Sequence, residues 1–221
     1  MLMTKPKLSH TSPCRLAVLL LAAGEGSRLG SYPKALLKKR GLTLLQRFME
    51  SIEDFSPLEL IVVTGFHAEV IESTLDELAV LMPPKMSSVM KVCRNLEPAR
   101  GQAASVRLGL ESLQSEYDVL LVALSDQPEI EAAEIQDLLD AFSVRSTDQE
   151  MLLPMVGTRR GNPVLFSRKA INAILAIPGM TCRPYMDAHP AQVGQMQTHK
   201  QAFILDVDTP EDIQMHQLTR S

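Results

Sequence analysis

The segment LAAGEGSRLGSYPK, residues 21–34, constrains the fold and function of this chain more than any other. It follows an apolar run at residues 16–21, which predicts a strand buried in a parallel sheet. The turn after this run contains three glycines, Gly24, Gly26 and Gly30. Without side chains at these positions, backbone N–H groups can approach an anion closely. Arg28 and Lys34 add two cations suited to phosphate oxygens. The segment therefore predicts a polyphosphate site at the end of the first strand.

The segment differs from two familiar phosphate-binding patterns. The P-loop pattern G-x-x-x-x-G-K-[ST] is not met, because Ser31, Tyr32 and Pro33 separate Gly30 from Lys34. The dinucleotide pattern G-x-G-x-x-G is missed by one position, and Pro33 would lie in the early turns of the helix that this pattern requires. A dinucleotide loop and a glycine-rich surface turn with incidental charges stay open as alternatives.

The length and charge of the chain limit its class. A chain of 221 residues with 45% hydrophobic residues suffices for one α/β domain, which we expect at residues 14–221. The formal net charge of −4, with no run of five basic residues, argues against a nucleic-acid partner. Cys14, Cys93 and Cys182 are odd in number and form no C-x-x-C pair, which is typical of reduced thiols in a cytoplasmic protein.

The N-terminal region imitates a secretory signal peptide, because Lys5, Lys7 and Arg15 precede an apolar run. That run is about eight residues long, whereas a helix that spans a bilayer needs ~20. Cleavage after the run would also remove the predicted first strand. We therefore expect a cytoplasmic protein without a membrane partner, in which residues 1–13 form a disordered leader.

Strand-like and helix-like segments alternate along the chain. Strands are predicted at residues 15–22, 60–64, 89–94, 118–124, 151–154, 163–166, 192–197 and 202–206. Helices are predicted at residues 42–54, 67–81, 102–114, 131–143, 168–177 and 209–219. This alternation favours a mostly parallel sheet with helices on both faces. The connections at residues 83–84 and 144–150 are expected to be surface loops.

Three aspartates are placed to face the glycine-rich segment. Asp126 follows the fourth predicted strand, and Asp206 and Asp208 follow the last one. In open α/β sheets, ligands bind beyond the carboxyl ends of the strands. Two aspartates two positions apart lie on the same side of an extended segment, and carboxylate oxygens suit Mg²⁺. We therefore predict a magnesium site, with a plain turn at Asp126 and helix capping by Asp208 as the alternatives.

Four motifs give the chain a family resemblance. The loop LAAGEGSRLG with its Pro-Lys pair resembles the signature of nucleotidyltransferases that move a nucleoside monophosphate from an NTP onto a phosphorylated acceptor. The other three motifs are SDQP at residues 125–128, RGNPVLF at 160–166 and DVDTPED at 206–212. They are similar to segments of the molybdenum cofactor cytidylyltransferases, and the four together span residues 18–212 in the expected order.

This resemblance implies a fold and an activity. The fold would be a single-domain, Rossmann-like, three-layer nucleotidyltransferase fold with a mostly parallel mixed sheet. The activity would be Mg²⁺-dependent transfer of CMP from CTP to molybdopterin, with release of pyrophosphate and delivery of the product to a molybdoenzyme. Ala23 and Pro33 resemble the cytidine version of the loop, which favours CTP over GTP.

The resemblance also assigns roles to residues. Lys34 would act on the phosphates and the developing negative charge, Arg28 on the β- and γ-phosphates, and Asp126 would be the catalytic metal ligand. Asp208 would be the second metal ligand, with Asp206 behind it. The remaining nucleotide-binding positions would be Ala22, Ala23, Gly24, Gly26, Asn95, Gly101 and Ser105.

The chain departs from the family pattern at two positions. Ser125 replaces the usual glycine before Asp126, which would be strained if the backbone needed a positive φ there. Asn162 replaces a histidine, so the proposed acceptor residues Gly161, Asn162 and Arg183 leave another phosphorylated acceptor open. A non-catalytic carrier or chaperone for the cofactor is the alternative from a different class. His67, at a predicted helix start, is expected to be structural.

Overall fold

The computed structural model describes residues 14–220, so the predicted leader at residues 1–13 lies outside the described part of the chain. The main sheet contains β1 (Leu16–Ala22), β4 (Glu59–Thr64), β5 (Met90–Arg94), β6 (Val119–Leu124), β7 (Met151–Val156), β8 (Arg159–Arg160), β9 (Val164–Ser167) and β10 (Val193–Thr198). A separate antiparallel pair is formed by β2 (Lys38–Lys39) and β3 (Leu42–Thr43). The α-helices are α1 (Leu44–Glu53), α2 (Ala68–Leu81), α3 (Pro84–Val89), α4 (Gln102–Glu111), α5 (Ala132–Ser143), α6 (Arg168–Ala176), α7 (Cys182–Ala188) and α8 (Pro210–Met215). Short 3₁₀ helices are η1 (Ser27–Leu29), η2 (Lys34–Leu36), η3 (Pro98–Arg100), η4 (Pro190–Gln192) and η5 (Gln201–Ile204).

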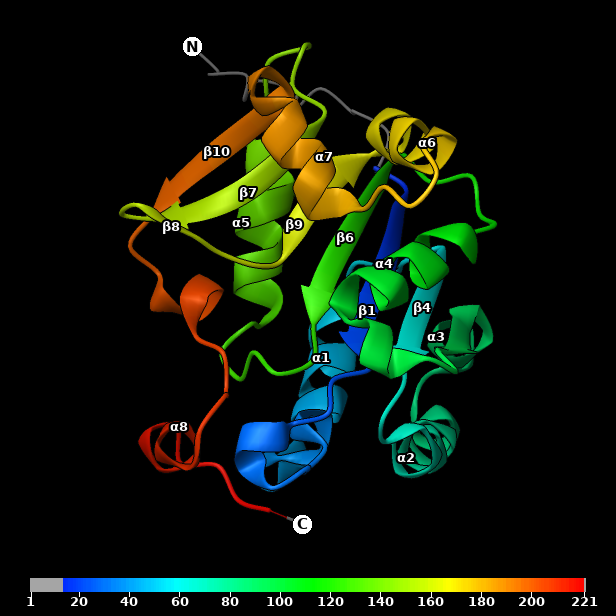
Figure 1. Ribbon diagram of the computed structural model, residues 1–221, viewed down its shortest axis with the longest axis vertical. Coiled ribbons are helices and arrows are strands. Elements are labelled where there is room, and N and C mark those ends of the chain that lie inside the picture. Colours follow the sequence, from blue (N-terminus) through cyan, green and yellow to red (C-terminus); the bar gives the residue numbers. More distant parts are fainter. Residues whose placement is uncertain (1–13, 221) are drawn as a thin grey trace, which may run out of the picture.

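The strands of the main sheet pair in the order β10-β7-β9-β6-β1-β4-β5, and β8 pairs with β7 (Figure 1). Strands β6, β1, β4 and β5 run parallel to one another, as do β7 and β10. Because β9 runs antiparallel to both β6 and β7, these two strands end at the same edge of the sheet. The start of β9 therefore lies at the edge where β1 and β6 end, which brings distant loops together.

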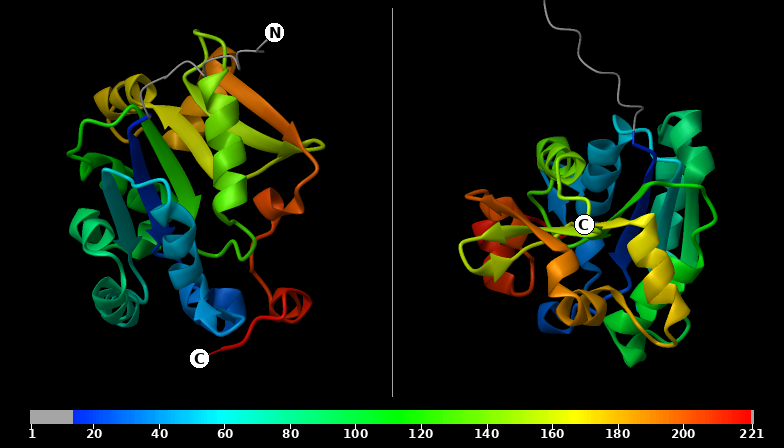
Figure 2. Two further views of the ribbon diagram at one scale, coloured as in Figure 1. Left: turned by 180° about the vertical axis from the view of Figure 1, so that it is seen from behind. Right: turned by 90° about the horizontal axis from the view of Figure 1, so that it is seen from above.

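Helices cover both faces of this sheet, as the views in Figure 2 show. Alternate side chains of β1 point to opposite faces, and the whole strand is buried. One set packs with apolar side chains of α1, α2, α3 and α5, and the other packs with those of α4, α6 and α7. The predicted α/β class, with a mostly parallel mixed sheet and helices on both faces, is confirmed. None of the helices within residues 14–220 is long and apolar enough to cross a membrane.

The structure corrects three local expectations. The strand predicted at residues 202–206 is wrong, because this segment forms the 3₁₀ helix η5, where the carbonyl of Phe203 accepts a 2.8 Å hydrogen bond from the N–H of Asn162. The loop expected at residues 83–84 instead leads into α3, with Pro84 in its first turn. Helix α7 was not predicted, although its buried residues Cys182, Tyr185 and Met186 have helical spacing.

The last helix begins one residue later than a capping role for Asp208 requires. Thr209 is its N-cap, and the hydroxyl of Thr209 accepts a hydrogen bond from the N–H of Asp212. The carboxylate of Asp212 in turn accepts from the N–H groups of Asp208 and Thr209. The side chain of Asp208 is therefore not used to cap the helix and faces the site described next.

Candidate active site

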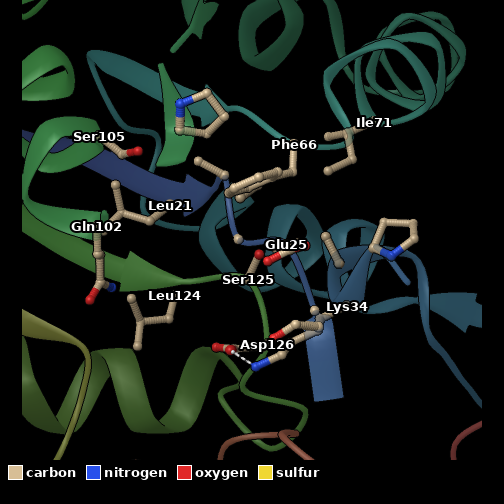
Figure 3. A pocket seen from close by; sticks show the side chains of 18 of the residues that line it. Leu21, Glu25, Lys34, Phe66, Ile71, Gln102, Ser105, Leu124, Ser125 and Asp126 are labelled. Atoms are coloured by element: carbon tan, nitrogen blue, oxygen red, sulfur yellow. Dashed lines mark hydrogen bonds and ion pairs between the residues drawn. The ribbon is translucent and has the colours of Figure 1, made fainter. Parts of the chain in front are cut away.

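A pocket of about 490 Å³ lies beyond the carboxyl ends of β1 and β6 (Figure 3). The glycine-rich loop forms one wall, and Phe66, Pro98 and Gln102 contribute to the others. Asp126 and Lys34 lie together at one end of the pocket, joined by an ion pair. Phe66 and Gln102 are not among the site residues predicted from the sequence. Phe66 could have been found, because it follows the carboxyl end of a predicted parallel strand, where ligands bind in such sheets.

The glycine-rich loop has the backbone conformation that its sequence requires. Gly26 has a φ of 66°, and a Cβ atom on it would lie 2.1 Å from the carbonyl oxygen of Tyr32. Glycine alone fits this position. The N–H groups of Gly24, Glu25 and Gly26 have no hydrogen-bond acceptor within residues 14–220. They are available to bind an anion at the pocket wall.

Lys34 joins the two predicted acidic segments. Its Nζ donates hydrogen bonds to Oδ2 of Asp126 at 2.9 Å and to Oδ1 of Asp208 at 2.5 Å. Arg28 reaches the same Asp208 carboxylate, with 3.3 Å between its guanidinium nitrogen and Oδ2. Burial alone would lower the pKa of Lys34, but the two carboxylates outweigh it and hold the pKa above its ordinary value. Lys34 is therefore a cation held between two carboxylates.

The backbone also joins the two acidic segments. The N–H of Val207 donates a 3.0 Å hydrogen bond to the carbonyl of Asp126, and the Val207 side chain is fully buried. Asp206 and Asp208 flank Val207 and are brought next to the end of β6. Ser125, before Asp126, is not among the residues with positive φ and donates its N–H to the carbonyl of Leu21. The strain considered for Ser125 is therefore absent.

The pKa of Asp206 is shifted by its surroundings. The residue is exposed as a whole and does not line the pocket, but its carboxyl group is partly desolvated close to Asp126 and Asp208. This desolvation, together with the carboxylates of Asp126 and Asp208, raises the pKa of Asp206 to about 6. A nearby cation would stabilise the ionised form of this carboxyl group.

The three carboxylates fit a divalent cation by their chemistry. Oδ1 of Asp126 is buried and has no hydrogen-bond partner within residues 14–220. It is thus an acceptor oxygen without a donor, and the donor set of carboxylates suits Mg²⁺ or Mn²⁺. Within the same residues, however, no three His, Cys, Asp or Glu side chains are already arranged to hold a metal ion. The ammonium of Lys34 lies between two of the predicted ligands instead.

The predicted base-recognition segment is only partly at the pocket. Gly101 and Ser105 line it, whereas Asn95 does not. The amide of Asn95 donates to the hydroxyl of Ser105 at 2.9 Å, and its carbonyl accepts from the N–H of Glu97 at 2.9 Å. Asn95 is buried, and both polar atoms of its side chain make a hydrogen bond, so in this arrangement it supports Ser105 rather than facing a ligand.

The predicted acceptor residues do not line the pocket. A Cβ atom on Gly161 would lie 2.5 Å from the carbonyl oxygen of Phe203, so this glycine permits close packing of two segments. Gly161 and Asn162 support η5, which leads to Asp206. Arg183 is exposed on α7. The structure therefore gathers Lys34, Arg28 and the three aspartates, but not the acceptor set.

A doubly covered α/β sheet with an anion-binding loop and a lysine between two aspartates defines a nucleotidyltransferase class of protein. The chain belongs to the family described as the MobA-like NTP transferase domain, which it matches over residues 18–193. The matched span contains the glycine-rich loop, Lys34 and Asp126. It ends before Asp206 and Asp208.

A similar curated protein is the bifunctional protein GlmU of Mycobacterium ulcerans, which is 30% identical over 178 residues. The match covers 80% of this chain but 34% of GlmU, so the chain spans about a third of the length of this relative.

Similar solved structures share the fold. Rv0371c from Mycobacterium tuberculosis H37Rv has a TM-score of 0.70 and 23% identity, with 91% of this chain and 97% of that chain covered. A structure of Rv0371c in complex with manganese has a TM-score of 0.64 and 19% identity, at 91% and 97% coverage. The inositol-1-phosphate CTP transferase from T. maritima has a TM-score of 0.61 and 16% identity, covering 93% and 95%.

Proposed function

We propose that this protein transfers CMP from CTP to a phosphorylated acceptor, with molybdopterin as the leading acceptor, and releases pyrophosphate. The observation that carries the proposal is the placement of Lys34. Its ammonium bridges Asp126 and Asp208 beside a loop whose N–H groups are free to bind phosphate. A cation, paired carboxylates and an anion-binding loop at one point are what nucleotidyl transfer requires.

In the proposed reaction, a phosphate oxygen of the acceptor forms a bond to the α-phosphorus of CTP. The bond from that phosphorus to the bridging oxygen breaks, and pyrophosphate leaves with the electron pair. The free N–H groups at Gly24 to Gly26 bind the triphosphate, and Arg28 and Lys34 neutralise its charge. A divalent cation held by Asp126, Asp206 and Asp208 would add Lewis-acid stabilisation of the transferring phosphoryl group.

The preference for CTP is proposed from the loop sequence. Ala23 is buried at the pocket wall, and its carbonyl and methyl group lie against the turn at Gly65. A small side chain here leaves room for a base beside the backbone. Competition between CTP and GTP in one assay tests this reading, and a clear preference for GTP would contradict it.

The experiment that tests the function is a pyrophosphate-release screen with the purified protein. Each NTP is combined with Mg²⁺ or Mn²⁺ and with one acceptor, namely molybdopterin, inositol 1-phosphate or methylerythritol phosphate. We expect release with CTP and molybdopterin. Release with another acceptor would change the substrate but keep the reaction class. Tight CTP binding without release under any condition would favour the carrier function and overturn the enzymatic proposal.

A further inference from the structure

The turn after β4, residues 65–67, lies directly against the glycine-rich loop. A Cβ atom on Gly65 would lie 2.8 Å from the carbonyl oxygen of Ala23, so glycine permits this approach. The N–H of Phe66 donates to the same carbonyl at 3.4 Å. Nε2 of His67 lies 2.7 Å from the carbonyl oxygen of Glu25. Two segments 42 positions apart are thus joined at the pocket wall.

The contact with Glu25 determines which nitrogen of the His67 imidazole carries a proton. A carbonyl oxygen only accepts hydrogen bonds, so Nε2 of His67 carries the proton and donates it. His67 is also the N-cap residue of α2, yet its side chain makes no capping hydrogen bond there. Capping of its own helix, the usual structural reason for a polar residue at this position, therefore does not explain the side chain.

The contact also orients the loop. A peptide unit is planar, so fixing the carbonyl of Glu25 fixes the direction of the N–H of Gly26, which points the opposite way. No other hydrogen bond to the carbonyl of Glu25 exists within residues 14–220. The N–H of Gly26 belongs to the group without an acceptor at the pocket wall. One imidazole therefore holds one of the anion-binding groups in place.

We propose that His67 is a positioning residue for triphosphate binding: by donating to the carbonyl of Glu25, it holds the glycine-rich loop in its anion-binding conformation. This inference rests on the proposed function and concerns the same site. Without the imidazole, the loop is free to sample other conformations, and the ligand must order it on binding.

The test compares wild type with His67→Ala and His67→Gln, since the amide nitrogen of glutamine can replace the donor. His189→Ala is the matched control. Nδ1 of His189 lies 2.9 Å from the carbonyl oxygen of Tyr185, on α7 and outside the pocket lining. This variant loses a comparable imidazole–carbonyl contact without touching the loop.

Two measurements are made on each protein. The first is the ¹⁵N order parameter of Glu25 and Gly26 without ligand, which we expect to fall from about 0.85 to below about 0.6 in His67→Ala. The second is calorimetric affinity for inorganic tripolyphosphate and for CTP, which we expect to weaken roughly tenfold in His67→Ala, a change of about 1.4 kcal/mol. His67→Gln should restore most of both properties, and His189→Ala should leave both unchanged.

The outcomes separate the role of His67 from the proposed function. Unchanged order parameters and affinities in His67→Ala would overturn the positioning role. A lower melting temperature alone, as expected for His189→Ala, would overturn it as well, because it is the mark of a purely structural contact. If wild type binds neither tripolyphosphate nor CTP, the proposed function fails, while the order parameters still decide whether His67 holds the loop.

Discussion

Asp206 gives the sharpest test of the electrostatics at this site. Desolvation and the carboxylates of Asp126 and Asp208 raise its pKa from 3.8 to about 6. A pKa raised by folding means that this group contributes stability below about pH 4 and that the contribution is lost as the pH rises through 6. At neutral pH, the ionised carboxylate therefore destabilises the metal-free fold. Asp206→Asn removes this charge, and we expect the variant to be more stable than wild type.

The magnitude follows from the size of the shift. A shift of about two pKa units corresponds to roughly 3 kcal/mol for a fully buried group. Because Asp206 is exposed, solvent screening reduces this to about 1 kcal/mol. For a chain of 221 residues, that is a rise of roughly 2–4 °C in melting temperature. Because the destabilisation by Asp206 develops between about pH 4 and pH 6, about half of the gain in stability should remain near pH 5.

The assay is thermal unfolding of both proteins in EDTA between pH 5 and 8, followed by a repeat at pH 8 with Mn²⁺. The metal should stabilise wild type more than Asp206→Asn, because the variant lacks one proposed ligand. Asp187→Asn is the control, since Asp187 forms an exposed ion pair with Arg160 and its loss should not raise stability. The reasoning would be refuted if Asp206→Asn were no more stable than wild type at pH 8. It would also be refuted if the gain in melting temperature were the same at pH 5 and pH 8.

Three further substitutions test other parts of the structure. Asp126→Ala should lower pyrophosphate release by roughly 10²-fold or more and leave the urea midpoint almost unchanged, and wild-type turnover would remove Asp126 from the mechanism. Glu59 is buried, and although burial alone would raise its pKa, hydrogen bonds from Lys91 and two backbone N–H groups hold the pKa below its ordinary value. Glu59→Gln should therefore cost about 1–3 kcal/mol at pH 7 by urea unfolding and less at pH 3, since the stability from a lowered pKa is lost as the pH falls through it. Phe203→Ala should cost about 3–5 kcal/mol by the same method, because this side chain is fully buried, and a loss under 1 kcal/mol would contradict its role in the core.

The central strands β1, β4 and β6 were predictable because they are mostly apolar runs that are buried almost throughout. The error at residues 202–206 has the same origin. Phe203 and Ile204 are as apolar as a buried strand, but they are buried in a 3₁₀ helix. The carbonyl of Phe203 accepts a hydrogen bond from the N–H of Asn162 and not from a neighbouring strand. Hydrophobicity predicts burial, and it does not say which partner takes the backbone hydrogen bonds.

The candidate site was predictable where the order of the strands alone determines which loops lie close together. Loops that follow parallel strands meet at one edge, so the approach of Asp126, after β6, to the glycine-rich loop, after β1, follows from the strand order. Asp208 follows no strand and is held there by the hydrogen bond from Val207 to the carbonyl of Asp126. Side-chain pairing does not follow from the strand order. The use of the Asn95 amide by Ser105 depends on rotamers and burial that no sequence pattern encodes. The contact between Lys34 and Asp208 spans 174 positions and is equally hidden.

The hydrogen bond from Val207 to the carbonyl of Asp126 has a consequence for experiments on this protein. It fixes the spacing of the two acidic segments through the carbonyl of residue 126 and the N–H of residue 207, which remain in place when the side chain of Asp126 or Asp208 is changed. The carboxylates can therefore be exchanged one at a time on an unchanged frame. A loss of turnover in such variants then reports the missing carboxylate together with its ion pair to Lys34, and not a shift of the backbone that carries it.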